Sequence, residues 1–194
     1  MAVPRHRVLD FLRSRSADRI VHLNGTLLDH LLATEELLRS WGSSERLCLA
    51  GLAHATYGTD GFAPTLLAWA DRAVLGEVAG AEVEETVYLY ASCDRSSLYP
   101  QFAGDRPVRF RDRFRQVTFE PSDTQLRDFV DLTLANEIEI ALPDDTSDPP
   151  PWIAPLVAQM EARASPEARR GARRLLRRWS SPTTIRRGPG PVRR

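Results

Sequence analysis

The segment LLDHLLATEELLRSWGSSERLCLAGLAHATY, residues 27–57, decides the fold of this chain. At about 100° per residue, its first half places apolar side chains on one broad face and acidic side chains opposite. Gly42 then ends the pattern, as glycine commonly does at a helix C-terminus, and Ser43 or Ser44 can cap a second helix that runs to about Tyr57. This second helix is apolar nearly all round, which predicts that it is central and buried.

The same criteria extend outward along the chain. Asn24-Gly25 is a turn signal, and Thr26 can cap the helix that follows it. Between 92 and 121 the chain is rich in Arg, Asp, Pro and aromatic residues and is expected to be a structured loop region. Three further helices are expected before the middle of the chain, one within 1–19 and two between 65 and 91. After it, helices are expected from Ser122 or Asp123 to about Leu142, near 152–162, and from Ser165-Pro166 onward. The sequence therefore predicts an all-α helical bundle.

Composition limits the class of protein. The chain has 194 residues, of which 42% are hydrophobic, enough for one domain with a substantial core. Its two cysteines favour a reducing compartment over a disulfide framework. No apolar run reaches the ~20 residues that span a bilayer, and the N-terminus lacks the apolar core of a signal peptide. We expect a cytoplasmic protein with no membrane partner.

The net charge of zero conceals a separation of charge. Residues 163–194 hold eleven arginines and one acid, Glu167, so that residues 1–162 are strongly acidic. The proline-rich segment at 143–152 is interpreted as a linker between a helical domain, 1–142, and a C-terminal part, 153–194, made of a basic helix and a disordered tail. The basic part is expected to be dispensable for any pocket, and to attract nucleic acid, another anionic partner or the acidic body of the chain itself.

Polar residues interrupt the apolar faces at a few positions. His30 has the helical angle of Leu37, and His54 lies on the buried helix. Asn136 and Glu137 share a face with apolar residues of their helix, whereas Asp128, Asp131 and Glu139 are assigned to the solvent face. Buried polar groups are costly unless they are paired or bind a ligand, so each is either a hydrogen-bonded core residue or part of one shared cavity.

The segment DHLLATEELLRSWGSSERLCLAGLAHATYGTD, with the later LTLAN, resembles the core of the HD superfamily of metal-dependent phosphohydrolases. In that family one helix carries a histidine, the next ends in a His-Asp pair, and a late helix supplies a second aspartate. His30 matches the first histidine, His54 matches the histidine of the pair, and Asn136 takes the place of the late aspartate. The resemblance covers roughly 20–142, and GAEVEETVYLY is similar to the segment after the pair in the alarmone-hydrolase branch.

The sequence departs from the family pattern at the ligand positions. Ala55 replaces the aspartate of the pair, Asn136 replaces the late aspartate, and Gly58 and Thr59 replace the acids that follow the pair in the alarmone hydrolases. Alanine cannot ligate, and a neutral amide oxygen is a weak ligand for a hard cation. The chain is thus expected to be a divergent branch in which the standard phosphohydrolase site is degraded.

Two hypotheses for the site follow. In the first, His22, His30, His54 and Glu137 hold a single Fe or Zn ion, which suits imidazole ligands. Because the HD fold also hosts iron oxygenases, the resemblance implies either hydrolysis or oxygenation for such a site.

In the second hypothesis the metal is lost, and His30 and His54 act with Tyr57 as catalytic groups beside Asn136. Arginines at 95, 111 and 113 would then recognise a phosphate or carboxylate of the ligand, although they also fit surface ion pairs.

The function predicted from the sequence is turnover or binding of a small polar metabolite in a central His-lined pocket, within a biosynthetic pathway. The alternative is a non-catalytic, HD-like ligand-binding or regulatory protein whose basic tail binds an anionic partner.

Overall fold

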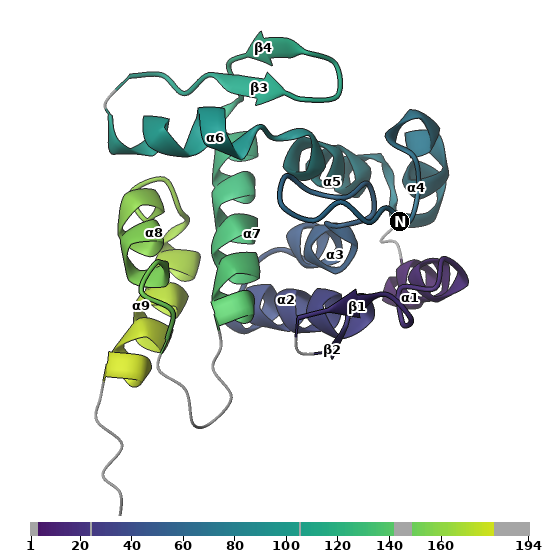
Figure 1. The fold of residues 1–194 in the computed structure, drawn as a ribbon, viewed down its shortest axis with the longest axis horizontal. Coiled ribbons are helices and arrows are strands. Elements are labelled where there is room, and N and C mark those ends of the chain that lie inside the picture. Colours follow the sequence, from purple (N-terminus) through teal and green to yellow (C-terminus); the bar gives the residue numbers. More distant parts are fainter. Residues whose placement is uncertain (1–3, 24, 105, 142–148, 181–194) are drawn as a thin grey trace, which may run out of the picture.

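The computed structural model describes residues 4–23, 25–104, 106–141 and 149–180. Within these ranges the fold is all-α, with two small antiparallel hairpins (Figure 1). None of the helices described is both long enough and apolar enough to cross a membrane. Residues 143–148 of the expected linker, 143–152, and residues 181–194 of the expected disordered tail lie outside the described residues.

Helix α2, Leu27–Trp41, has the ends that its sequence predicts. The Thr26 hydroxyl accepts a hydrogen bond from the Asp29 amide, and the Asp29 carboxylate accepts one from the Thr26 amide, which completes a capping box. At the other end Gly42 has a φ of 85°, a left-handed conformation that glycine adopts without steric cost. These two signals fix the length of the helix that carries His30.

Helix α3, Glu45–Ala53, is buried as predicted but shorter than expected. The Ser44 hydroxyl caps it by accepting from the Leu47 amide. The prediction that it extends to Tyr57 was wrong, because the chain leaves the helix at His54 and enters turns in which Gly58 has a φ of 69°. His54 therefore stands at the end of the helix, where its ring can face a cavity.

The middle of the chain forms two helices, as predicted, and then a more ordered region than expected. The helices are α4, Arg72–Ala79, preceded by a 3₁₀ turn at Trp69–Asp71, and α5, Ala81–Ser92. The segment expected to be a loop contains α6, Arg95–Leu98, a 3₁₀ turn at Tyr99–Ala103, and strands β3, Phe110–Asp112, and β4, Val117–Phe119. Phe110 pairs with Phe119 in this hairpin. Short strands of this kind carry too little periodicity to be recognised from sequence.

The first part of the chain covers one edge of the bundle. Helix α1, Arg5–Ser14, packs against α3 and α4 through Val8, Phe11 and Leu12. Strands β1, Val21–His22, and β2, Gly25–Thr26, form a hairpin where the sequence predicted a turn. The hairpin leads directly into α2.

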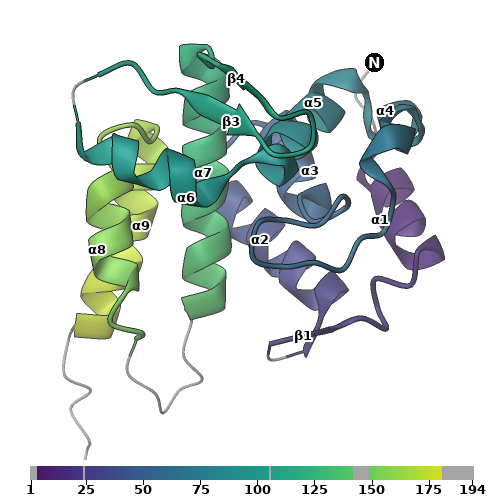
Figure 2. The ribbon, with the colours of Figure 1, turned by 45° about the horizontal axis from the view of Figure 1, so that its top comes forward.

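Helix α7, Asp123–Ala141, is the central element. In Figures 1 and 2 it stands between the pair α8–α9 on one side and the group α2, α3 and α5 on the other, and it packs against all five. The Ser122 hydroxyl caps it by accepting from the Gln125 amide. Such a helix has almost no face turned wholly to water. The assignment of Asp128, Asp131 and Glu139 to a solvent face was therefore wrong. Asp131 is buried, and the other two are partly buried and form ion pairs.

Helices α8, Ile153–Met160, and α9, Pro166–Ser180, pack onto the bundle. The buried apolar residues of the two helices and of the turn between them belong to the same hydrophobic cluster as those of α1–α7. They are Ile153, Val157, Met160, Ala164, Ala168 and Ala172. The proline-rich segment therefore does not separate two packing units, and this packing argues against the expectation that everything after Pro149 is dispensable. The sequence misled here because small residues can pack closely: Gly171 of α9 lies directly against the ring of Trp41.

Candidate functional site

Three buried polar side chains from three different helices meet at one point. His30 comes from α2, His54 from the end of α3, and Asn136 from α7, and each is less than 5% exposed. His30 Nε2 lies 3.3 Å from His54 Nε2 and 3.1 Å from Asn136 Oδ1. The convergence predicted from sequence for these three residues is therefore present in the fold.

The outer nitrogen of each imidazole is held by a hydrogen-bond acceptor. His54 Nδ1 lies 2.7 Å from the Gly51 carbonyl oxygen, and His30 Nδ1 pairs with the Glu139 carboxylate. A carbonyl or carboxylate oxygen can only accept, so Nδ1 carries the proton in both rings. In the neutral form of each ring, the Nε2 lone pair then points to the place where the two histidines meet.

The ionisation of the neighbouring histidines follows from their burial. Burial lowers the pKa of His54 to about 3, and the nearby His30 lowers it further. Burial also lowers the pKa of His22, again with His30 as the second cause. His54 is thus neutral at physiological pH, and its Nε2 can accept a proton or bind a ligand.

The two histidines and Asn136 form the floor of a cavity of about 350 Å³. The β1–β2 hairpin and the loop after α3 make its walls, with Ala55 beside His54. The lining residues are Val21, His22, Leu23, His30, His54, Ala55, Thr59, Gly61, Phe62, Arg95, Asn136, Glu137 and Ile140. A cavity of this size accommodates a small metabolite.

His22 belongs to the wall of the cavity. Its ring stacks on His30, with centroids 4.2 Å apart, and meets Phe62 edge-on at 4.9 Å. Two histidines share a metal ion only when a nitrogen of each ring points at the ion within the plane of its ring. Because His22 and His30 are stacked face to face, their nitrogens do not point at a common position. His22 therefore supports His30 by packing and closes the cavity on the side of the hairpin.

Glu137 and Arg95 form the opposite wall as an ion pair of 2.9 Å. Glu137 Oε1 also accepts from the Asn136 amide at 3.2 Å, so that Asn136 Oδ1 points toward His30. Arg95 donates a further hydrogen bond to the Tyr90 hydroxyl at 3.0 Å, while its Nε is buried without a partner. The two terminal nitrogens of Arg95 are therefore engaged by Glu137 and by Tyr90.

Three predicted site residues lie elsewhere. The Tyr57 hydroxyl donates to buried Glu84 at 2.9 Å, which also pairs with Arg72, and burial raises the tyrosine pKa. Arg111 lies on β3, half exposed, near Asp94, and the Arg113 Nε donates to the Ala91 carbonyl. None of the three lines the cavity, so the structure gives them structural contacts in place of their predicted roles.

The metal ligands predicted from sequence do not assemble as a set. Over the part of the chain that the structure describes, no group of three or more His, Cys, Asp or Glu residues is placed to hold a metal ion. Glu137 is engaged by Arg95, and His22 is stacked. The donors that do converge are His30, His54 and Asn136.

Sequence reasoning missed Glu139 and Phe62. Glu139 lies one helical turn after Asn136, and this i, i+3 spacing was the available signal that both could face the same cavity. It was missed because a helix packed on two sides has no simple solvent face. Phe62 follows a loop whose course over the cavity has no signature in the sequence.

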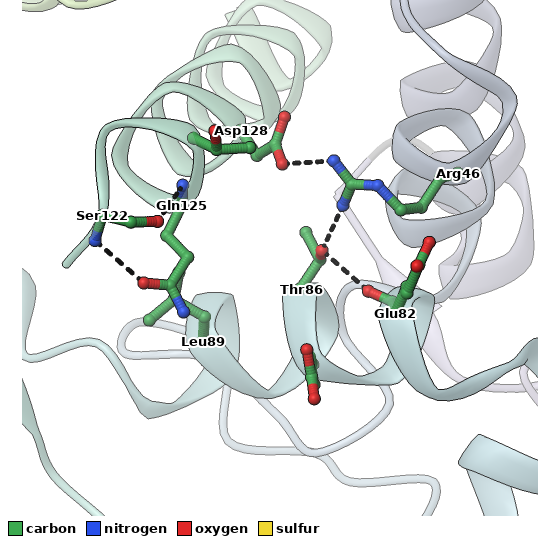
Figure 3. Close-up of a pocket in the computed structure, with 9 residues that line it drawn as sticks. Arg46, Glu82, Thr86, Leu89, Ser122, Gln125 and Asp128 are labelled. Atoms are coloured by element: carbon green, nitrogen blue, oxygen red, sulfur yellow. Dashed lines mark hydrogen bonds and ion pairs between the residues drawn. The ribbon is translucent and has the colours of Figure 1, made fainter.

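A second cavity, of about 380 Å³, lies between α3, α5 and α7 (Figure 3). Arg46 crosses it, donating to the Thr86 hydroxyl at 2.8 Å and pairing with Asp128, while Ser122 and Gln125 bond each other. These five side chains already satisfy one another, in contrast to the facing lone pairs of the histidine cavity; Glu82 and Glu85, which also line the second cavity, are exposed to water. The two cavities are similar in volume, so the choice between them rests on this chemistry.

The model of a family described as a domain of unknown function, DUF6817, matches residues 11–95, which includes His30 and His54 but not Asn136. No curated protein and no solved structure matches the chain.

Proposed function

We propose that this chain is a divergent HD-like protein that binds a small polar metabolite in the histidine cavity and turns it over. The observation that carries the proposal is the 3.3 Å separation of His30 Nε2 and His54 Nε2 at the floor of a cavity of about 350 Å³. Two imidazole lone pairs repel at this distance unless a proton or a cation lies between them. The site is therefore built to hold a positive charge or a hydrogen-bond donor.

Acid–base chemistry is one use of this arrangement. The Glu139 carboxylate holds Nδ1 of His30, and Nε2 of the same ring faces His54 and Asn136. His54, neutral because its pKa is lowered to about 3, is the acceptor of the pair. A ligand with a hydroxyl or amine group that displaces one of these contacts would exchange a proton with His30, the role of a general acid or base.

A transition-metal ion is the other use. Two imidazole nitrogens with anchored Nδ1 protons and an amide oxygen make a donor set that fits Zn or Fe, with Glu139 and the Gly51 carbonyl as the outer partners. When bound, such an ion would polarise a substrate oxygen or acidify a water molecule. All three donors are neutral, so the affinity is expected to be lower than that of a site with carboxylates.

The ligand is expected to be polar at the floor of the cavity and less polar at its mouth. His30, His54 and Asn136 offer hydrogen bonds at the floor, and the Arg95–Glu137 ion pair lines the cavity beside them. Val21, Leu23 and Ile140 are among the apolar residues that line it. The Arg95 charge is balanced by Glu137, which favours a neutral or singly charged ligand over a polyphosphate.

The test is ligand-induced thermal stabilisation of the full chain, because a ligand that binds only the folded state raises Tm. The probes are Zn²⁺, Fe²⁺ and Mn²⁺ salts and a panel of small hydroxy, amino and carboxylic metabolites. A compound that raises the Tm of the wild type and of His6→Ala, a surface control, should have no effect on His54→Asn. If no probe shifts Tm, or if the shift survives in His54→Asn, the proposal fails.

A gain-of-function variant separates the two uses of the site. Asn136→Asp and Ala55→Asp restore the carboxylates that the HD resemblance implies, both at the cavity wall. If the cavity is a metal site, the double variant should retain more Zn or Fe after purification than the wild type. If metal content stays at background in both, the acid–base use is favoured.

The alternative, a non-catalytic binding protein, has one observation in its favour. Ala55 is buried at the cavity wall where a catalytic carboxylate is expected. A compound that binds with the pattern above and is recovered unchanged after long incubation would support this alternative.

A further inference from the structure

Helix α9 carries a strongly basic outer face. Successive residues of a helix are separated by about 100°, so the arginines form two neighbouring rows with a repeat of four residues, which is about 6 Å along the axis. The first row is 169, 173 and 177, and the second row is 170, 174 and 178. Together they line a shallow groove of about 420 Å³, to which no other residue type contributes within the part of the chain that the structure describes.

The opposite face of α9 is used by the fold. Ala168 and Ala172 are buried, and Leu175, Leu176 and Trp179 are partly buried against the core. In Figure 1 the helix lies at the edge of the molecule, beyond α7 as seen from α5. The basic rows are therefore held on a fixed element and turned outward.

Much of this charge is unbalanced within the described residues. Arg170 pairs with Glu167 and Arg173 pairs with Glu161, at 2.7 Å each. In the same part of the structure the side chains of Arg169, Arg174 and Arg178 form no ion pair. Like charges held this close repel each other, so an anion with closely spaced charges is the expected partner.

We propose that the outer face of α9 binds the phosphate backbone of double-stranded DNA without reading its sequence. The guanidinium group matches phosphate oxygens in a bidentate way, and two rows about 100° apart can reach the phosphates on the two sides of one groove. The B-form major groove, about 12 Å wide, admits a helix, whereas the major groove of an RNA duplex is too narrow. This surface is separate from the histidine cavity, and the proposal is independent of the function proposed for that cavity.

Other polyanions fit the surface less well. An anionic membrane would favour a helix with apolar side chains next to the basic ones, but the apolar side of α9 faces the core. Single-stranded nucleic acid would favour aromatic rings on which bases stack, and the groove has none. The backbone of a duplex requires neither feature.

The test compares two triple variants of the full chain by fluorescence anisotropy with a 20-bp DNA duplex. One variant, R169A/R174A/R178A, removes the unpaired arginines of α9. The other, R13A/R19A/R109A, removes the same charge from exposed positions elsewhere. Titrations between 50 and 200 mM NaCl give the slope of log K against log salt, which falls by about one for each lost phosphate contact.

We expect the wild type and the second variant to bind with the same slope. The α9 variant should lose roughly tenfold or more in affinity at low salt, and its slope should be smaller by about three. Equal weakening in both variants would show a response to net charge alone and would overturn the proposal. So would the absence of DNA binding by the wild type, equal or tighter binding of an RNA duplex, or binding to anionic vesicles in place of DNA.

Discussion

Replacing Gly171 by alanine tests how α9 is seated on the bundle. A Cβ atom at this position would lie 2.3 Å from Trp41 Cδ1 and 2.4 Å from Trp41 Nε1. Carbon atoms in contact are normally about 3.5–4.0 Å apart, so the helix or the indole ring must move by more than ~1 Å. Trp41 is a rigid, buried ring at the end of α2, which leaves little room for adjustment.

Two opposing terms determine the change in unfolding free energy. Alanine is a better helix former than glycine by about 1 kcal/mol. Overpacking of a core costs about 1–3 kcal/mol, and a clash of this depth with a rigid ring belongs to the upper part of that range. We therefore expect Gly171→Ala to be destabilising by about 1–2 kcal/mol.

Gly76→Ala is the matched control, because Gly76 is also helical and an added Cβ there meets nothing within 4 Å. It should be stabilising by up to about 1 kcal/mol. Urea denaturation followed by circular dichroism measures both variants. If Gly171→Ala is as stable as Gly76→Ala, α9 does not rest on Trp41, and the fixed basic face inferred for this helix loses its support.

Two further predictions concern the C-terminal helices. A chain that ends at Asp148 should aggregate or unfold, because it loses the buried side chains Ile153, Val157 and Met160. Burial of each contributes about 1.5–3 kcal/mol, and the sum is comparable to the stability of a whole domain. A monomeric product by size-exclusion chromatography, with a Tm within a few degrees of that of the full chain, would contradict this. Burial raises the pKa of Asp131 from 3.8 to about 6, so the native state holds its proton more tightly than the unfolded chain, and stability is lost as pH rises from about 4 through 6. Asp131→Asn keeps an acceptor for the Ser165 amide. The variant should be more stable than the wild type at pH 7.5, by on the order of 2–3 kcal/mol, but not at pH 4. Urea titrations at the two pH values measure the difference, and an equal effect at both would refute the raised pKa of Asp131.

The helices with strong local signals were predictable from the sequence. Thr26 and Gly42 mark the ends of α2, and Ser44 marks the start of α3, because caps satisfy backbone groups within a few residues and do not depend on the rest of the fold. The all-α class follows from such local signals. That His30 and His54 are buried also followed from the helical period, because each interrupts an apolar face.

What those buried groups touch was decided by the tertiary structure. Helix α7 packs on two sides, which turns Glu139 toward His30 and buries Asp131, whereas a helix considered alone has one wet face. Tyr57, predicted beside the cavity, is held by Glu84, because the chain leaves α3 earlier than its apolar pattern indicates. Arg113, also predicted there, follows β3 and is held by the Ala91 carbonyl. Hydrogen-bond partners distant in sequence depend on the relative placement of whole helices, and helical periodicity does not encode that placement. The sequence by itself determined which side chains are withdrawn from water, and the packing of α2, α3 and α7 determined which of them form a site.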